Sequence, residues 1–156
     1  NLTKFDKCIV ATGAHSLPGL PLPIPKVRAS RGVTMRLRGP RGAPGMVRGF
    51  VDGRQIYAVR HPSGEIVVGA ISDELSTTHV AVRDIRELSE SISRLIPAIE
   101  EAEFVEARAG LRPTTADARS FFVAAHQRLA VTSGYFRHGV LLAPVARSRA
   151  EDFWRA

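Results

Sequence analysis

Hydrophobic and polar residues follow two kinds of pattern along the chain, one typical of strands and one typical of helices, and Gly and Pro residues separate the stretches that show them. Short apolar runs, alternating or continuous, predict β-strands, whereas apolar residues at i, i+3, i+4 and i+7 predict one face of an α-helix. By the first pattern we expect strands over 5–12, 27–37, 54–60, 65–71, 104–109 and 129–132. By the second we expect helices over 81–96 and 140–150, the first of which Pro97 ends.

The connections between these elements indicate the fold class. Strands 54–60 and 65–71 are joined by His61-Pro62-Ser63-Gly64, which is a good hairpin signal. Four prolines between residues 18 and 25 predict an extended crossing segment, and the glycines from 39 to 45 predict a flexible loop. Single helices lie between strand-rich stretches, which favours an α+β fold over a doubly wound one.

Composition mainly excludes classes of protein. The chain has 156 residues, of which 44% are hydrophobic and 24% charged, a globular mixture long enough to bury a core. The net charge of +7 comes almost entirely from Arg residues that are scattered rather than clustered. Without interleaved surface aromatics or a recognised motif, we expect no nucleic-acid partner.

The single cysteine and the absence of a long apolar stretch indicate the compartment. Cys8 is the only cysteine, so no internal disulfide can form, and its apolar neighbours predict a buried strand. No run of 18 apolar residues and no signal peptide is visible, so we expect a cytoplasmic chain without a membrane partner. Because the sequence opens with Asn1 rather than Met, we expect a fragment or a processed product. The five histidines show no metal-ligand spacing, and we expect no metal site.

Four segments carry a family resemblance through their order and spacing. They are VATGA at 10–14, YAVRHPSGEIVVGAI at 57–71, AGLRPTT at 109–115 and SGYFRHGVLLAP at 133–144. Together they resemble the C-terminal half of the flavoenzyme family of glycine oxidase and D-amino acid oxidase, over nearly the whole chain. The sequence departs from the family over 117–126, and His138 stands where the family often has Asn.

The resemblance implies a division into parts. Residues 1–25 would be the tail of an FAD-binding domain, 26–110 a substrate-binding domain with a mixed or antiparallel sheet and helices, and 111–156 a C-terminal segment that completes the FAD and substrate sites. The family's strand, GxGxxG turn and helix, which hold the FAD diphosphate, are absent from this sequence. The glycines at 39–45 lack that context. We therefore expect the chain to need a missing N-terminal FAD-binding segment as its partner and to be inactive alone.

The resemblance also implies which residues bind substrate. Arg112 would hold the substrate carboxylate, because a planar guanidinium binds a carboxylate bidentately. Arg137 would help to hold the amino acid, and Tyr57 would donate its hydroxyl and wall the pocket. Gln55 lies on the same strand face as Tyr57, and Ser72 follows the partner strand, so both are further candidates for the pocket wall.

The implied cofactor residues lie in two segments. Thr12 and Gly13 would lie beside the ribityl and diphosphate region of FAD. The second segment would present a helix N-terminus to the pyrimidine carbonyl of the flavin, a contribution of about 0.3–2 kcal/mol. Its residues are Tyr135, Phe136, Arg137, His138, Gly139, Val140 and Leu141.

The implied activity is FAD-dependent oxidative deamination of glycine or a small D-amino acid, with a role in thiamine biosynthesis. A sarcosine oxidase-like enzyme or a D-amino acid dehydrogenase of the same fold is an alternative, as is a non-catalytic fragment or interaction module. The residues taken alone leave other roles open. Arg112 could be a surface residue paired with Asp117 or Glu106, Tyr57 a half-buried strand residue, and 133–144 an ordinary strand-to-helix turn. Oligomeric state, including a homo-oligomer, also stays open.

Overall fold

The computed structural model describes residues 4–15, 23–39, 45–74 and 76–156. The chain consists of two compact units, one made of residues 1–30 and 111–156 and the other of residues 31–110. Two long strands, β2 (Arg28–Arg38) and β6 (Glu103–Thr114), continue from one unit into the other. Two of the four prolines predicted to form the crossing segment, Pro18 and Pro21, and residues 40–44 of the predicted loop lie outside the described residues.

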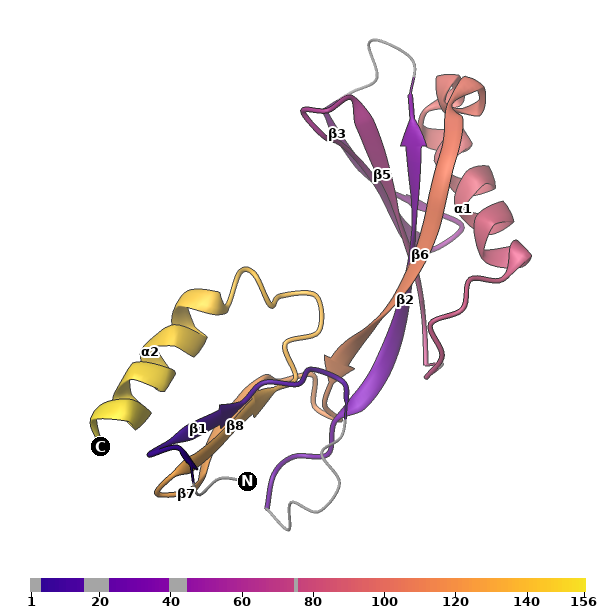
Figure 1. Ribbon diagram of the computed structural model, residues 1–156. Coiled ribbons are helices and arrows are strands. Elements are labelled where there is room, and N and C mark those ends of the chain that lie inside the picture. Colours follow the sequence, from indigo (N-terminus) through magenta and orange to yellow (C-terminus); the bar gives the residue numbers. More distant parts are fainter. Residues whose placement is uncertain (1–3, 16–22, 40–44, 75) are drawn as a thin grey trace. The chain divides into compact units, whose positions relative to one another are not determined.

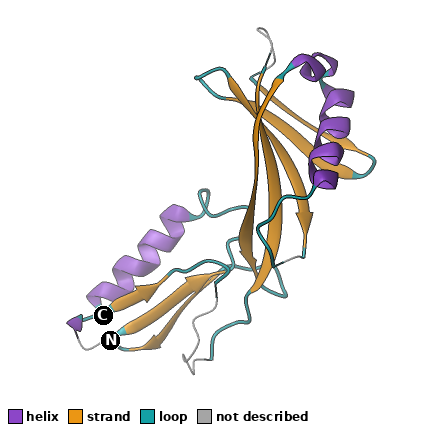
Figure 2. Cartoon of the chain, turned by 45° about the vertical axis from the view of Figure 1, so that its right-hand side comes forward, coloured by secondary structure: helices purple, strands orange, loops and turns teal. Residues whose placement is uncertain are grey.

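The second unit is a five-stranded sheet covered on one face by a helix. The sheet has the order β3-β4-β5-β2-β6, in which β3 is Met46–Val51, β4 is Arg54–Arg60 and β5 is Glu65–Asp73. The pairs β3–β4, β4–β5 and β5–β2 are antiparallel. Helix α1 (Val82–Leu95) lies along one face of this sheet and is followed by the 3₁₀ helix η2 (Pro97–Glu101) (Figures 1 and 2).

The core of this unit forms because strand side chains alternate between the two faces. One face turns apolar residues toward the buried Leu88 and Ile92 of α1. The buried strand residues of this core are Val33, Met35, Leu37, Ile56, Ala58, Ile66 and Val68. The helix-facing positions of β4 are therefore Ile56 and Ala58, and its intervening residues Gln55 and Tyr57 lie on the opposite face.

The first unit contains a three-stranded mixed sheet and one helix. The strand order is β1-β8-β7, in which β1 (Cys8–Val10) is parallel to β8 (Leu129–Ser133), and β7 (Phe121–His126) is antiparallel to β8. Helix α2 (Ala143–Arg155) lies alongside this sheet (Figure 2). No helix in the described part of the chain is long and apolar enough to span a bilayer.

The C-terminal turn of α2 is fixed to the sheet through Phe153. This side chain is buried and packs edge-on against Phe122 of β7, with 6.3 Å between the ring centroids. Lys7 donates from its Nζ to the Phe153 carbonyl at 2.9 Å, and its ammonium lies 5.2 Å from the centre of the Phe153 ring. One residue before β1 thus anchors the last helix of the chain.

The α+β class expected from the sequence is confirmed, with one mixed sheet and one largely antiparallel sheet. Strand 54–60 and helix 81–96 match β4 and α1 to within a residue at each end. Strands β3 and β7 were not expected, β6 continues to Thr114 through Pro113, and the last helix begins at Ala143 rather than at 140. Cys8 is half-buried rather than buried, because β1 is a short edge strand.

Candidate cofactor and substrate sites

A cavity of about 330 Å³ opens at the carboxyl ends of the parallel strands β1 and β8 in the first unit. The loop after β1 contributes Thr12, Gly13, Ala14 and His15 to its lining, and β8 contributes Val131, Thr132 and Ser133. Carboxyl ends of adjacent parallel strands are a recurrent position for ligands in sheets covered by helices. Two of the cofactor residues expected from the sequence, Thr12 and Gly13, therefore line a real cavity.

Side-chain hydroxyls in β8 hold the wall of this cavity in place. Ser133 donates from its Oγ to the carbonyl of Gly13 at 2.9 Å, which joins the end of β8 to the loop after β1. Thr132 donates to the Phe121 carbonyl at 2.9 Å, and its hydroxyl lies 2.5 Å from that of Tyr135. Gly13 has φ = 67°, a left-handed conformation that glycine adopts without strain. The cavity thus combines apolar side chains, such as Val10, Phe121 and Val131, with hydroxyls that already bond backbone.

A turn at Gly134 directs the chain away from β8. Gly134 has φ = 81°, and a Cβ at this position would lie 2.8 Å from the Arg119 carbonyl, so any larger residue would displace the neighbouring loop. That loop is closed by Thr115, whose hydroxyl lies 2.9 Å from Asp117 and 2.8 Å from the Arg119 carbonyl. The hydrogen bonds from Thr115 and from the Arg119 N–H lower the pKa of Asp117. The turn therefore starts from a rigid base.

The two arginines expected to bind substrate are brought together by a backbone hydrogen bond within the first unit. The N–H of Phe136 donates to the carbonyl of Pro113 at 2.8 Å, and each of these residues is the immediate neighbour of one arginine. Arg112 is half-buried at the end of β6, and Arg137 is exposed, with its guanidinium 5.0 Å from the centre of the Phe136 ring. Arg112 and Arg137 are thus each one residue away from a hydrogen bond that joins the end of β6 to this loop.

The loop that precedes α2 carries the remaining cofactor residues expected from the sequence. His138 bonds the Tyr135 carbonyl and Leu142 bonds the His138 carbonyl, both at 2.8 Å, so the loop consists of consecutive turns. No side chain caps the helix, whose N-cap residue is Leu142. The apolar side chains of Val140 and Leu141 are 93% and 74% exposed. Because the Ala143 N–H donates to the Val140 carbonyl at 3.3 Å and Pro144 has no N–H, the first turn of the helix offers little beyond the Val145 N–H, and two uncovered apolar residues precede it.

The candidate substrate residues of the second unit share the sheet face opposite α1. The register pairs Tyr57 directly with Gly69 of β5, and Gln55 lies two residues from Tyr57 on the same face. A shift in the register between Val33 and Thr34 brings Ser72 to this face as well. Ser72 lies within β5 rather than after it, and is exposed. Tyr57 is half-buried, and its hydroxyl has no hydrogen-bond partner among the residues that the structure describes.

Next to Ser72, the sheet is fixed to α1 by a buried ionic cluster that the sequence patterns did not indicate. Arg31 of β2 is 1% exposed and donates to Asp73 at 2.6 Å, to Asp84 at 3.0 Å and to the His79 carbonyl at 2.8 Å. Hydrogen bonds to Asp73, and then to Asp84, raise the pKa of Arg31. Burial opposes ionisation of Asp84, but hydrogen bonds from the Ala81 N–H and from Arg31 outweigh it and lower the pKa of Asp84.

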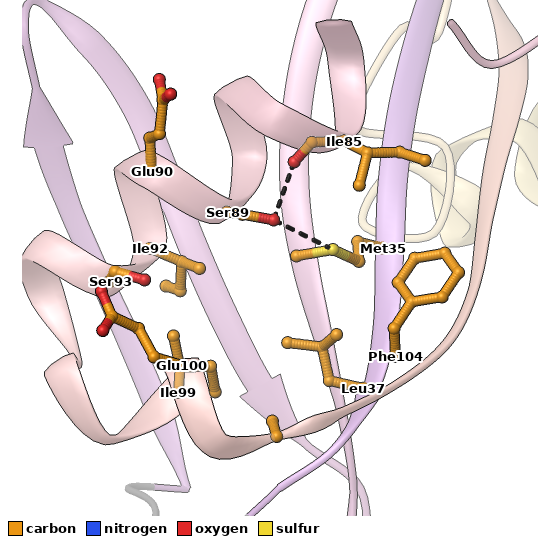
Figure 3. Close-up of a pocket in the computed structure, with 11 residues that line it drawn as sticks. Met35, Leu37, Ile85, Ser89, Glu90, Ile92, Ser93, Ile99, Glu100 and Phe104 are labelled. Atoms are coloured by element: carbon orange, nitrogen blue, oxygen red, sulfur yellow. Dashed lines mark hydrogen bonds between the residues drawn. The ribbon is translucent and has the colours of Figure 1, made fainter. Parts of the chain in front are cut away.

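A second cavity, of about 420 Å³, lies between α1, η2 and the helix-facing side of the sheet (Figure 3). Its floor is apolar and includes Met35 and Leu37, and Phe104 flanks it. Ser89 turns its hydroxyl back to the Ile85 carbonyl at 2.8 Å. None of the residues expected to bind substrate or cofactor lines this cavity. Within the described residues, no cluster of His, Cys, Asp and Glu is arranged to hold a metal ion.

Comparison with known proteins places the chain in a family. Residues 1–151 match the DAO family model, described as FAD dependent oxidoreductase. The bifunctional protein ThiO/ThiG of Nostoc sp. is 32% identical over 154 residues, which is 97% of this chain but 23% of that protein. The glycine oxidase of Bacillus licheniformis is 32% identical over 100 residues, 62% of this chain and 27% of that protein.

Solved structures give the same relationship. Glycine oxidase from Geobacillus kaustophilus matches with a TM-score of 0.82 at 25% identity, over 94% of this chain and 40% of that one. Iminodiacetate oxidase from Chelativorans sp. BNC1 matches with a TM-score of 0.78 at 25% identity, over 91% of this chain and 40% of that one. The chain thus spans less than half the length of these relatives. It belongs to the DAO family of FAD-dependent oxidoreductases.

Proposed function

We propose that this chain is the C-terminal part of an enzyme that oxidatively deaminates glycine or a small D-amino acid with FAD. The observation that carries the proposal is the hydrogen bond between Phe136 and Pro113, which ties the loop of Arg137 to the strand of Arg112. The guanidinium group of an arginine suits a substrate that carries a carboxylate. Relatives named glycine oxidase, which match much of the chain, support the same class of substrate.

The residues of the first unit fit part of an FAD molecule. The cavity at the ends of β1 and β8 is lined by the backbone around Gly13, which has no side chain to obstruct a close approach. The positive end of the α2 dipole, with the Val145 N–H in its first turn, suits the negative charge that would develop on a reduced flavin ring, and Val140 and Leu141 offer apolar surface for the ring to cover. The sequence contains no GxGxxG turn for the diphosphate, so we propose that an upstream segment holds that end.

In this proposal the protein's own residues bind and orient the substrate. Arg112 and Arg137 hold the carboxylate, and Tyr57 donates its hydroxyl to the same group. Gln55 and Ser72 limit the space for the substrate side chain. Bound FAD would supply the two-electron oxidation that removes the α-hydrogen as hydride, with dioxygen as the final oxidant that becomes hydrogen peroxide, and no strong acid or base from the protein is required. The imine that leaves is hydrolysed by water to an oxo acid and ammonia.

The test uses the complete protein that contains this chain. We expect it to bind FAD and to produce hydrogen peroxide with glycine or D-alanine, and faster than with sarcosine or iminodiacetate. Preference for a secondary amine would favour the sarcosine oxidase-like alternative, and turnover only with an artificial electron acceptor would favour a dehydrogenase. A protein that binds FAD but oxidises none of these amino acids would refute the proposed substrate class. A role in thiamine biosynthesis predicts that deletion of the gene makes growth depend on added thiamine.

A further inference from the structure

We propose that Gly69 is a positioning residue that determines where the hydroxyl of Tyr57 is held over the sheet. The role of Tyr57 toward substrate rests on the proposed function, whereas its placement by Gly69 rests on the structure alone. Gly69 lies at the centre of a row of three paired positions, with Tyr57 of β4 on one side and Thr34 of β2 on the other. All three lie on the face opposite α1.

The space above Gly69 is filled by the end of the Tyr57 ring. A Cβ built on Gly69 would lie 2.5 Å from both Cζ and the hydroxyl oxygen of Tyr57, and 2.9 Å from Cε1. Ordinary van der Waals contacts of a Cβ begin at 3.4 Å. The ring therefore lies across β5, with its polar tip directly above the backbone of Gly69, in a position that only glycine permits.

The ring, rather than the sheet, is the part that must give way if Gly69 gains a side chain. Gly69 is buried and is paired in the ladder on both sides, so its backbone is held by two neighbouring strands. The atoms in conflict are the far end of the Tyr57 side chain, whose hydroxyl has no hydrogen-bond partner among the described residues. A methyl group at residue 69 would therefore displace the tip of the ring by about 1 Å or more.

A displacement of this size has a functional consequence if the hydroxyl contacts the substrate carboxylate. Misplacing a substrate-positioning group by about 1 Å can reduce the rate by about 100-fold. We therefore expect Gly69→Ala in the complete enzyme to lower kcat/KM for glycine by about 100-fold, without loss of bound FAD. Because Gly69 acts through Tyr57, the double variant Tyr57→Ala/Gly69→Ala should lose no more activity than Tyr57→Ala alone.

The placement itself can be tested by NMR, independently of any activity. The chain has two tyrosines, Tyr57 and Tyr135, whose resonances in the complete protein, labelled with ¹³C at tyrosine Cζ, are identified by their loss in Tyr57→Phe and Tyr135→Phe. Gly69→Ala should shift the Tyr57 resonance and leave that of Tyr135 unchanged. Gly110→Ala is the matched control, because Gly110 is also a strand glycine of this unit and a Cβ there meets nothing within 4 Å. The control should move neither resonance.

The possible outcomes separate the two claims. A shifted Tyr57 resonance with a harmless Tyr57→Ala variant would support the placement but refute the proposed role of Tyr57 toward substrate. An unshifted resonance, or activity losses that add in the double variant, would overturn the inference. If Gly69→Ala fails to fold, Tyr57→Ala should restore folding of the Gly69→Ala chain, since the conflicting ring is gone. Failure of that rescue would show that the backbone of residue 69 excludes alanine, which also overturns the inference.

Discussion

Replacing Arg31 by Met tests whether the buried ionic cluster holds the second unit together. The guanidinium of Arg31 is fully buried and donates to Asp73, Asp84 and the His79 carbonyl, thereby joining β2 to the end of β5 and the start of α1. Its removal would leave Asp84, which is 2% exposed, with only the Ala81 N–H as a described hydrogen-bond partner. Breaking a buried pair from one side costs about 3–5 kcal/mol. For a chain of this size that lowers the midpoint of thermal unfolding by about 6–20 °C.

A matched control lies on the same strand. Arg38 of β2 forms a 2.7 Å ion pair with Glu103, but the two side chains are 58% and 61% exposed. Exposed pairs contribute about 0–1 kcal/mol, because water solvates both charges when the pair is broken. Urea unfolding followed by circular dichroism should therefore separate Arg31→Met from Arg38→Met by at least about 2 kcal/mol. Equal, small losses for the two variants would refute the reasoning from burial.

The pH dependence gives a second, independent check on Arg31. The pKa of Asp84 is lowered in the folded protein, so its ionisation stabilises the fold above the unfolded pKa of about 3.9 and ceases to do so as pH falls through the folded value. Without Arg31, burial still raises the pKa of Asp84 while only the Ala81 N–H and Arg83 lower it, so the folded variant binds a proton at Asp84 more readily than the folded wild type does. The gap in unfolding free energy between wild type and Arg31→Met should thus narrow from pH 7 to pH 4. A constant gap would mean that Asp84 is not the group left without its partner.

Three further changes test the proposed sites. Arg112→Ala in the complete enzyme should lower kcat/KM for glycine by roughly 30-fold to several thousand-fold, from a loss of about 2–5 kcal/mol, while Arg112→Lys retains part of the activity. FAD should stay bound in both, and equal losses with an amine that lacks a carboxylate would contradict the clamp. Ser72→Met should shift preference from D-alanine toward glycine, and unchanged relative rates would place Ser72 away from the substrate. The 156-residue chain alone should be colourless and produce no peroxide, and stoichiometric FAD binding by it would contradict the need for an upstream segment.

The spacing of apolar residues correctly predicted those elements whose local pattern matches the face that they bury in the folded unit. The hairpin of β4 and β5 and the amphipathic helix α1 each bury one face within a single unit, so their apolar spacing is visible in the sequence. Strand β3 was missed because Gly49 interrupts the apolar pattern. In the structure Gly49 faces α1, and a Cβ there would make a tight contact of 3.2 Å with the Leu95 side chain. The residue that weakens the local strand signal thus lies at a tertiary contact with the helix.

The buried cluster was invisible to sequence reasoning for a different reason. Asp73 and Asp84 lie 42 and 53 residues after Arg31 in the sequence, so no local pattern links the three. A charged residue without a visible partner is normally predicted to be exposed to solvent. The sequence does offer one signal for Asp84. It is the N3 residue of α1, where a carboxylate commonly accepts a hydrogen bond from the N-cap N–H, here that of Ala81. Its second role, as a partner of Arg31, depends on the strand order of the sheet.

The positions of the candidate substrate residues follow from the same alternation that builds the core. Because Ile56 and Ala58 must face α1, Gln55 and Tyr57 are carried to the opposite face, and any change that moved Tyr57 inward would expose the core. If side chains simply alternated between the two faces along β5, Ser72 would face α1, because it is three residues from Gly69 and Gly69 lies on the opposite face. The register shift beside Val33 corrects this by one residue and returns Ser72 to the face of Tyr57. A local irregularity in the ladder, and not the hydrophobic pattern, therefore determines that β4 and β5 both contribute to this candidate substrate surface.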